Sequence, residues 1–435
     1  MMKASERLAL KDRMISLMRE IYPFQRMINS PGLDKAFEAV SRVLPEITIH
    51  EYPSGMECED WIVPNSWHVK EGYMHDSSGS IIASVEENYL FVAPYSEPIE
   101  GWFTKEEISN HLLTRPDRPE AFALEHRNAY DYKLKDWAIT LPFNRWQQLP
   151  EGKYYIKIDI ENKPGTMKVG EYYLEGKEKG ILCIAAHIDE LCNDDLSGCI
   201  VAIELIKALE KKQDRRFSYQ LLLVPEMFGT LFYISNNREK IEKTMGMLFL
   251  ETLGAGREWC LKKSLREEGW LEKALKNAME DLHLPFKELN FFEGYSNDER
   301  VYGWPTINIP GISLQRFPFK EYHTSDDNPD LVNGDYLLEA LDICLRFIQI
   351  LECDYVPRYT NYLQPWLTRS GLYYDAQEDP ENFEIFNNHI LFNINGNNSI
   401  LDLASRTGLS FFKVYDYLEL FFEKKLIEKL PVVWD

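Results

Sequence analysis

Residues 181–198 read ILCIAAHIDELCNDDLSG, and this stretch decides the fold of the chain. Its first six residues are apolar without alternation, which is typical of a strand buried on both faces of a sheet. The run ends at His187 and Asp189, and a loop with the pair Asp194-Asp195 follows. After the Ser-Gly step that closes the stretch, residues 199–209 show helical periodicity. The segment therefore predicts a buried strand, a polar loop at its carboxyl end and a helix.

The same order of elements continues downstream. Residues 219–224 and 245–250 are two further apolar runs without alternation, and residues 265–282 and 337–351 have helical periodicity. Such an alternation of buried strands and helices favours an α/β fold with a doubly wound mixed sheet.

The composition and the hydrophobic periodicity of the chain change on either side of this pattern. The region after residue 50 is aromatic, interrupted by Pro and Gly, and built of short runs such as 80–85, 89–94 and 154–160, which predicts strands. Beyond residue 360 the chain reads as helix, turn, helix and a short strand, which is similar to a winged helix. The expected domains are an α/β domain of residues 1–50 and 165–355, an inserted mostly β domain of residues 51–164, and a winged-helix domain of residues 360–435.

The 435-residue chain is acidic, with 48 Lys and Arg against 70 Asp and Glu and a formal net charge of −22. An acidic surface repels phosphate backbones, and the helix expected over residues 411–419 carries one Lys beside Asp and Glu. Both observations argue against nucleic acid as the main partner and favour packing, or assembly of a homo-oligomer, through the C-terminal domain. No apolar run approaches the ~20 residues of a membrane span, so we expect no membrane partner.

The seven cysteines predict a reducing compartment. Their number is odd, several lie inside apolar runs, and no pair has the Cys-x-x-Cys spacing of a cysteine zinc site. The first residues do not read as a signal peptide. We therefore expect reduced thiols in a cytoplasmic protein.

Metal-competent side chains collect where the predicted strands end. His187 and Asp189 follow the first strand, and Glu226 follows the second. Glu251 follows the third, and His323 lies in a later loop. Open α/β sheets bind ligands beyond the carboxyl ends of their strands, so we expect these side chains to meet on one rim. Two imidazoles and several carboxylates together are what a zinc hydrolase needs.

Each of these side chains suggests a role. Neutral imidazole and carboxylate bind zinc well, so His187, Asp194 and His323 are the leading candidate ligands. Asp189 can accept the proton on the other ring nitrogen of His187 and so fix the tautomer. Glu226 is placed to act as a general base, which takes a proton from water activated by the metal and passes it to a leaving amine.

Each residue alone also has a simpler structural interpretation. Asp194 or Asp195 could cap the following helix, and Asp189 could be a turn residue. Glu226 could be solvated, and His323 could be a hydrogen-bonded loop histidine. For any one of them we place the structural interpretation first. The functional interpretation gains the advantage because all of them occur in order at successive strand ends.

The order of these motifs resembles the co-catalytic zinc aminopeptidases, the family that includes glutamate carboxypeptidase and the glutaminyl cyclase fold. The resemblance covers about residues 165–355. It rests on His187-x-Asp189, Asp194-Asp195-x-Ser197-Gly198, Glu226 and Tyr322-His323-Thr324. It implies that His187, Asp194 and His323 bind metal, that Asp189 supports His187 and that Glu226 is the general base.

A closer resemblance covers nearly the whole chain. It rests on the motifs Glu51-Tyr52-Pro53-Ser54-Gly55, Asp60-Trp61-x-Val63-Pro64-x-x-Trp67, Pro94-Tyr95-Ser96-x-Pro98-x-x-Gly101 and Lys153-Tyr154-x-Ile156-x-Ile158-Asp159. These look like a bacterial family of aminopeptidase-like proteins of unassigned activity, with an inserted β domain and a C-terminal winged helix. Its members are often associated with polysaccharide biosynthesis.

Two positions depart from the aminopeptidase pattern. Met227 stands where the resemblance implies a second glutamate that binds a second metal, and a thioether is a poor replacement for a carboxylate on Zn²⁺. Glu251 stands where it implies an aspartate, and either reaches the metal or hydrogen-bonds one of its ligands. We therefore expect one firmly bound Zn²⁺ on His187, Asp194 and His323, completed by water or Glu251, and a weakened second site.

Two functions stay open at this point. The first is a metal-dependent hydrolase of aminopeptidase type, which removes an N-terminal residue or opens a related amide in a small peptide or aminoacyl-type substrate. The second is a catalytically degenerate relative that binds a peptide or amino-sugar ligand without turnover. Retention of Glu226 favours the first function, and Met227 favours the second.

Overall fold

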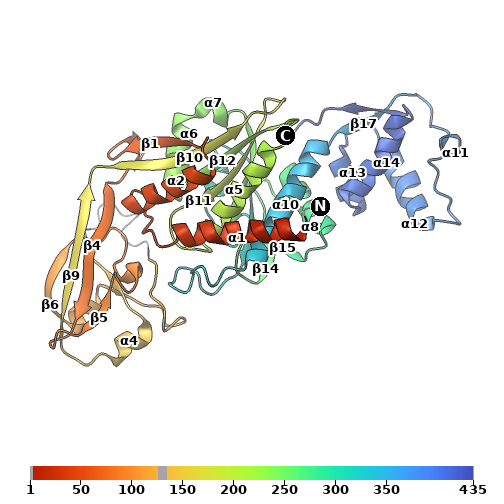
Figure 1. Ribbon diagram of the computed structural model, residues 1–435. Coiled ribbons are helices and arrows are strands. Elements are labelled where there is room, and N and C mark those ends of the chain that lie inside the picture. The colour runs from red at the N-terminus through yellow and green to blue at the C-terminus, as the bar shows by residue number, and fades with distance from the viewer. Residues whose placement is uncertain (1–2, 126–134, 435) are drawn as a thin grey trace.

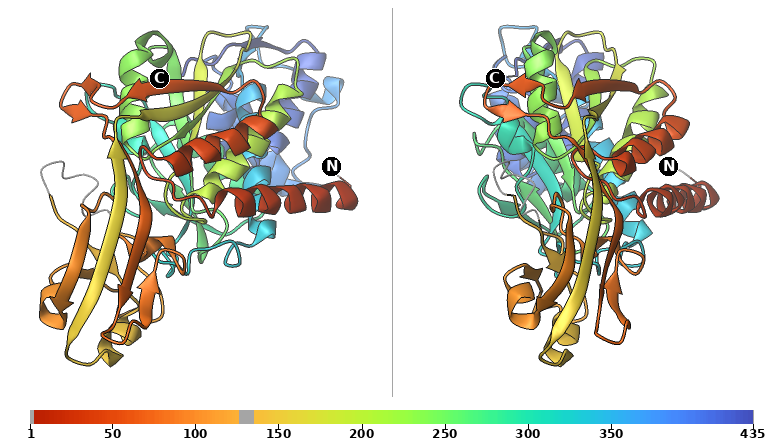
Figure 2. Two further views of the ribbon diagram at one scale, coloured as in Figure 1. Left: turned by 60° about the vertical axis from the view of Figure 1, so that its left-hand side comes forward. Right: turned by 90° about the vertical axis from the view of Figure 1, so that its left-hand side faces the viewer.

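The computed structural model describes residues 3–125 and 135–434. Figure 1 shows a central sheet with its helices, inserted strands at the lower left and C-terminal helices at the right. In Figure 2 the long yellow strand β9 (Lys153–Lys163) runs from the central body into the inserted strands.

Within the described residues, the central sheet has eight strands. Their order is β1 (Thr48–Pro53), β10 (Thr166–Leu174), β12 (Ser218–Val224), β11 (Ile181–His187), β13 (Thr244–Glu251), β16 (Gly311–Phe317), β14 (Glu258–Lys262) and β15 (Phe286–Leu289). β11 pairs in parallel with β12 and β13, and β13 pairs in parallel with β16. The carboxyl ends of these four strands therefore meet at one edge of the sheet.

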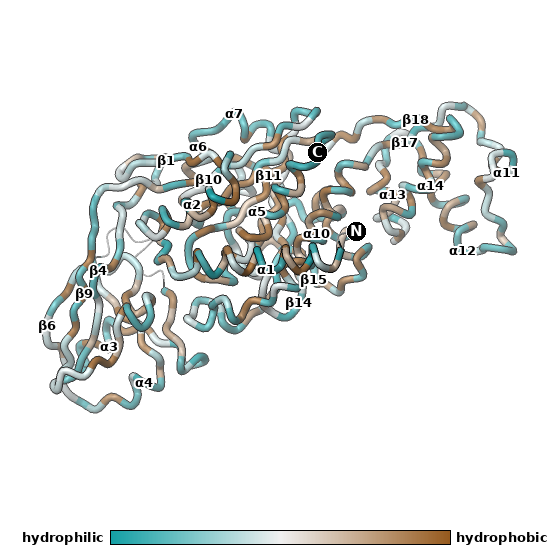
Figure 3. The backbone as a smooth tube through the Cα atoms, viewed as in Figure 1, coloured by the Kyte–Doolittle hydropathy of each residue, from teal (hydrophilic) through white to brown (hydrophobic). Residues whose placement is uncertain are grey.

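Every residue of β11 is buried, because helices cover both faces of the sheet. Leu182 and Ile184 belong to one hydrophobic cluster, and Cys183 and Ala185 belong to the other. The first cluster includes residues of α1 (Ala4–Ile21), α2 (Pro31–Val43), α5 (Leu196–Glu210), α8 (Trp270–Asp281) and α10 (Gly334–Cys353). The second includes residues of α6 (Phe228–Asn236) and α9 (Glu299–Tyr302). Figure 3 shows hydrophobic segments gathered around β11, α5 and α10, and the prediction of a mixed α/β sheet is confirmed.

A separate antiparallel sheet holds the inserted strands in the order β5 (Ile81–Ser84), β4 (Ser66–His75), β9 and β6 (Ile99–Thr104). The strand predicted at 89–94 is wrong, since residues Tyr89–Phe91 form a 3₁₀ turn that Asn88 caps. The helix predicted from residue 265 begins only at Trp270, because Glu272 binds back to Ser264 and holds the preceding residues in a turn.

The C-terminal helices α13 (Ile400–Thr407) and α14 (Phe411–Glu423) precede β18 (Ile427–Leu430), which pairs with β17 (Val356–Tyr359). Lys273 of α8 lies 2.8 Å from Asp402, and Ser410 Oγ donates to Asp281 at 2.7 Å. The apolar side of α14 joins the same hydrophobic cluster as α8 and α10. None of the described helices is long and apolar enough to cross a membrane.

One buried carboxylate ties together β1, β10, β12, α6 and the segment that follows α6. Glu171 accepts hydrogen bonds from His50, Gln220, Tyr233 and Lys240 at 2.6–2.8 Å. Burial alone would raise the pKa of Glu171, but these hydrogen bonds outweigh it and lower the pKa from 4.5 to about 2. The ionised carboxylate therefore stabilises the folded protein.

Because the pKa of Glu171 is lower in the folded chain, its contribution is complete above pH 4.5 and is lost as the pH falls toward about 2. We expect the free energy of unfolding to fall across this window, and Glu171→Gln to flatten part of the slope. Urea unfolding at a series of pH values measures this. An unchanged slope in the variant would show that other carboxylates govern acid sensitivity.

Candidate metal centre

The rim at the carboxyl ends of the parallel strands brings together the first group of metal-competent side chains. His187 is the last residue of β11, and Glu251 is the last residue of β13. His187 Nε2 lies 3.1 Å from Asp194 Oδ1 and 3.9 Å from Glu251 Oε1. The three side chains are 1–2% exposed. A cation between them would be almost entirely enclosed by protein.

Asp189 links His187 to the predicted base. One of its oxygens, Oδ1, lies 3.2 Å from His187 Nδ1 and accepts a hydrogen bond from the backbone N–H of Glu226 at 3.1 Å. A proton on Nδ1 leaves the lone pair of Nε2 facing Asp194 and Glu251, as a metal ligand requires. Burial and the charge of Glu190 raise the pKa of Glu226.

The two adjacent aspartates have different tasks. Asp195 Oδ1 caps α5 by accepting from Gly198 N at 3.0 Å and also accepts from Thr252 N at 3.1 Å. Asp194 instead turns toward the imidazoles, with its second oxygen, Oδ2, 3.4 Å from His323 Nε2. Asp195 also lies close enough to His187 and Glu251 to offer a ligand atom to an ion there.

The segment around residues 122–124 holds His323 in place. Its backbone oxygen accepts from Leu124 N at 2.8 Å, and Phe122 and Ser325 exchange hydrogen bonds next to it. Its ring stacks on Tyr322 with centroids 3.8 Å apart. The segment around residues 122–124, far from His323 in the sequence, therefore fixes the position of this imidazole.

Glu190 is not among the residues predicted from the sequence, yet its Oε2 lies 3.4 Å from His323 Nε2. Glu190 adopts φ +70°, a left-handed conformation that only glycine adopts without strain. Three other non-glycine residues of the rim loops have φ between 51° and 58°: Met227, Thr252 and His323. Backbone strain of this kind clusters at functional sites. The only signal in the sequence is that Glu190 directly follows His187-x-Asp189.

Arg26 holds the loop that carries Glu190. Its side chain is 0% exposed and donates to the backbone oxygens of Ile188 and Glu190 at 2.8 Å, and also to that of Leu191. A second nitrogen donates to Ile21 O at 2.9 Å at the end of α1. One buried guanidinium therefore joins α1 to the loop after β11.

We expect Arg26→Met to lower the free energy of unfolding by about 3 kcal/mol or more, because at least three buried carbonyls lose their donor. Urea unfolding at neutral pH measures the change. Arg42→Met is the matched control, since Arg42 is 59% exposed in a surface ion pair with Glu20. Equal stability of the two variants would contradict a role for Arg26 as a clamp.

The cluster contains more negative charge than its imidazoles balance. Asp194 Oδ2, Asp195 Oδ2 and Glu251 Oε1 accept no hydrogen bond from any described residue. Burial raises the pKa of Glu251 to about 8. Burial would lower the pKa of His323, but the charges of Glu190 and Asp194 outweigh it and raise the pKa to about 10. Imidazole and carboxylate donors that hold excess protons in a buried site suit a divalent cation, which displaces those protons.

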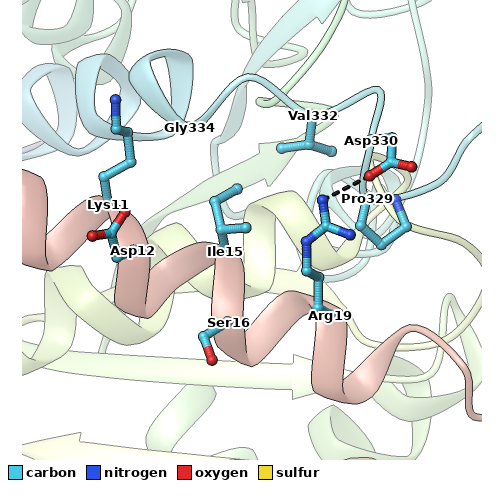
Figure 4. Close-up of a pocket in the computed structure, with 9 residues that line it drawn as sticks. All are labelled: Lys11, Asp12, Ile15, Ser16, Arg19, Pro329, Asp330, Val332 and Gly334. Carbon is cyan, nitrogen blue, oxygen red and sulfur yellow. Dashed lines mark hydrogen bonds and ion pairs between the residues drawn. The ribbon is translucent and has the colours of Figure 1, made fainter.

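A surface pocket lies between α1 and the loop before α10 (Figure 4). Lys11, Ile15 and Arg19 line one side, and Asp330 and Val332 line the other. Arg19 Nη2 lies 2.7 Å from Asp330 Oδ1 across it. The pocket shares no residue with the metal-competent cluster.

Comparison with known proteins assigns the chain to a family. Residues 15–354 match the family described as a domain of unknown function, DUF4910. The chain belongs to this family. A Clostridium acetobutylicum protein, provisionally named a polysaccharide biosynthesis protein with aminopeptidase-like domain, is 29% identical over 410 residues, with 92% of each chain covered. The predicted resemblance to an aminopeptidase-like family of unassigned activity is thereby confirmed.

Solved structures confirm the fold. A crystal structure from C. acetobutylicum, provisionally named a peptidase, is 26% identical, with 98% of each chain covered and a TM-score of 0.86. A zinc aminopeptidase from Bacillus subtilis is 12% identical and has a TM-score of 0.59, with 78% of this chain and 94% of that chain covered. At 12% identity, the similarity to the zinc aminopeptidase shows only that the two chains share a fold.

Proposed function

We propose that the protein is a metal-dependent hydrolase of aminopeptidase type, which cleaves an N-terminal residue or a related amide from a small peptide or aminoacyl-type substrate. The observation that carries the proposal is the buried group of His187, Asp194 and Glu251 on the strand-end rim. Glu226 follows the neighbouring strand, and its backbone N–H donates to Asp189, the partner of His187. We take Zn²⁺ as the metal, since imidazole nitrogen and carboxylate oxygen are among its usual ligands.

The chain's own residues divide the work. His187 and Asp194 would hold the ion, with Glu251 as a further carboxylate and His323 beside the other oxygen of Asp194. A zinc ion held there would supply a Lewis acid for an amide carbonyl and would make hydroxide available at neutral pH. Asp189 accepts a hydrogen bond from Nδ1 of His187 and so holds the tautomer whose Nε2 is free to bind the metal. Glu226 takes a proton from water and returns it to the leaving amine.

A substrate scan of the intact chain tests this proposal. Zinc-loaded protein is expected to hydrolyse at least one of a set of aminoacyl amides and short peptides. Removal of the metal by a chelator should abolish the activity, and added Zn²⁺ should restore it. If loaded protein hydrolyses none of them, the alternative of a peptide or amino-sugar binding protein without turnover replaces the proposal.

A further inference from the structure

The two oxygens of Asp194 face two different imidazoles. Asp194 Oδ1 lies 3.1 Å from His187 Nε2, and Asp194 Oδ2 lies 3.4 Å from His323 Nε2. On the side of His323, Glu190 Oε2 is also 3.4 Å from the same ring nitrogen. One shared carboxylate thus joins two groups of donors, His187 with Glu251 and His323 with Glu190.

The separations around His323 have the size that a tetrahedral ion requires. Donors about 2.0–2.2 Å from an ion, at tetrahedral angles, lie about 3.3–3.6 Å from one another. The distances from His323 Nε2 to Glu190 and to Asp194 both lie in this range. The spacing of His323 from both carboxylates therefore fits ligands that share one ion. Glu190 and Asp194 also each have a ligand atom within 4.8 Å of the other and of His187, so the two groups of donors adjoin.

Burial and backbone geometry indicate that Glu190 is positioned for a cation. Glu190 is 4% exposed and Asp194 is 2% exposed, and Asp194 Oδ2 accepts no hydrogen bond from the described part of the chain. Arg26 fixes the backbone oxygen of Glu190 at 2.8 Å while the residue keeps φ +70°. Three buried carboxylates, those of Glu190, Asp194 and Glu251, thus face the two imidazoles, and such an excess of buried acidic groups favours a bound cation.

We propose that Glu190, Asp194 and His323 form a second divalent-cation site, with Asp194 shared with the ion that His187 and Glu251 bind. The inference rests on the proposed function for the first ion and adds Glu190 as a ligand. Glu190, in the loop after β11, would then supply a carboxylate to the second ion. It would replace the glutamate that the aminopeptidase resemblance implies at the position of Met227. The single-ion expectation becomes an expectation of two.

Metal content tests this inference without an activity assay. Full-length protein is loaded with Zn²⁺, dialysed, and analysed for zinc per chain, and the binding of Co²⁺ to metal-free protein is followed by its visible absorption. We expect two equivalents in the wild type and one in Glu190→Gln, whose amide is nearly the same size. The affinity for the second Co²⁺ should fall by about 100-fold or more, since a direct ligand is lost. Glu239→Gln, which removes an exposed charge on α7 (Arg238–Ile241), is the matched control and should keep two.

The outcomes separate this inference from the proposed function. One equivalent in the wild type, or two equivalents in Glu190→Gln, would overturn the second site while the first stands. Two equivalents without hydrolysis of any aminoacyl amide would overturn the proposed function and leave the second site intact. If Glu190→Gln does not fold, Glu190→Asp retains the charge at shorter reach, and at least tenfold weaker binding of the second Co²⁺ is expected. Unchanged binding in that variant would also overturn the inference.

Discussion

Glu226→Gln is expected to lower turnover by about 10²–10⁴-fold, the range that a positioned acid–base group contributes. The amide is nearly isosteric with the carboxylate, so the half-buried position should still pack. The amide cannot accept a proton at neutral pH, so the step that depends on the base fails. Its backbone N–H, which donates to Asp189, is unaffected, so the imidazole of His187 should keep its support.

The kcat for the best aminoacyl amide, together with zinc content after dialysis, measures this result. Metal content should equal that of the wild type, which distinguishes loss of a base from loss of a ligand. Glu239→Gln serves again as the control for removal of one negative charge. Turnover near the wild-type value in Glu226→Gln would contradict the role of Glu226 as the base. Asp195 and Glu251 on the same rim would then be the next candidates.

His187→Ala is expected to lose the ion that His187, Asp194 and Glu251 bind, and with it the activity. Loss of a supporting partner of a ligand already costs 10–100-fold in metal affinity, so loss of the ligand should exceed about 100-fold. Zinc per chain should fall by one equivalent, and hydrolysis should fall to background. The imidazole lies between Asp189 and Asp194, so the substitution removes a nitrogen that contacts both carboxylates.

The matched control is His389→Ala. The side chain of His389 is 61% exposed, and the residue lies in the C-terminal part of the chain, outside the candidate metal centre. Circular dichroism and the midpoint of thermal unfolding show whether His187→Ala still folds. His187→Asn, which fills more of the buried space, gives the same comparison if it does not. A His187 variant that folds and keeps its full metal content would remove His187 from the set of ligands.

Strands and helices with strong local patterns could be predicted from the sequence. The unbroken apolar runs of β11, β12 and β13 and the periodicity of α5 and α10 gave their positions to within a few residues. The predicted strand at 89–94 failed because an Asn88 cap favours a local turn, and periodicity does not detect a cap of this kind. The short strands β14 and β15 were missed because their pairing depends on distant neighbours that the local pattern does not contain.

Most of the candidate site could be predicted for the same reason. Side chains that directly follow parallel strands, such as His187, Glu226 and Glu251, must meet at one edge of the sheet once the strands pair. The different orientations of Asp194 and Asp195 could not be predicted, because both are aspartates, and an aspartate can either cap a helix or bind a metal. The structure separates them through the hydrogen bonds of Asp195 to Gly198 and Thr252.

The sequence by itself determined the α/β pattern, the strand ends and the chemical types of side chain placed there, because these depend on residues close together in the chain. Only the tertiary structure decided that Glu190 faces His323, because that direction depends on Arg26, 164 residues away, and on a left-handed backbone. It likewise decided the position of His323, whose backbone oxygen accepts a hydrogen bond from Leu124, 199 residues earlier in the chain. Contacts between distant residues follow from packing, and no local periodicity encodes them.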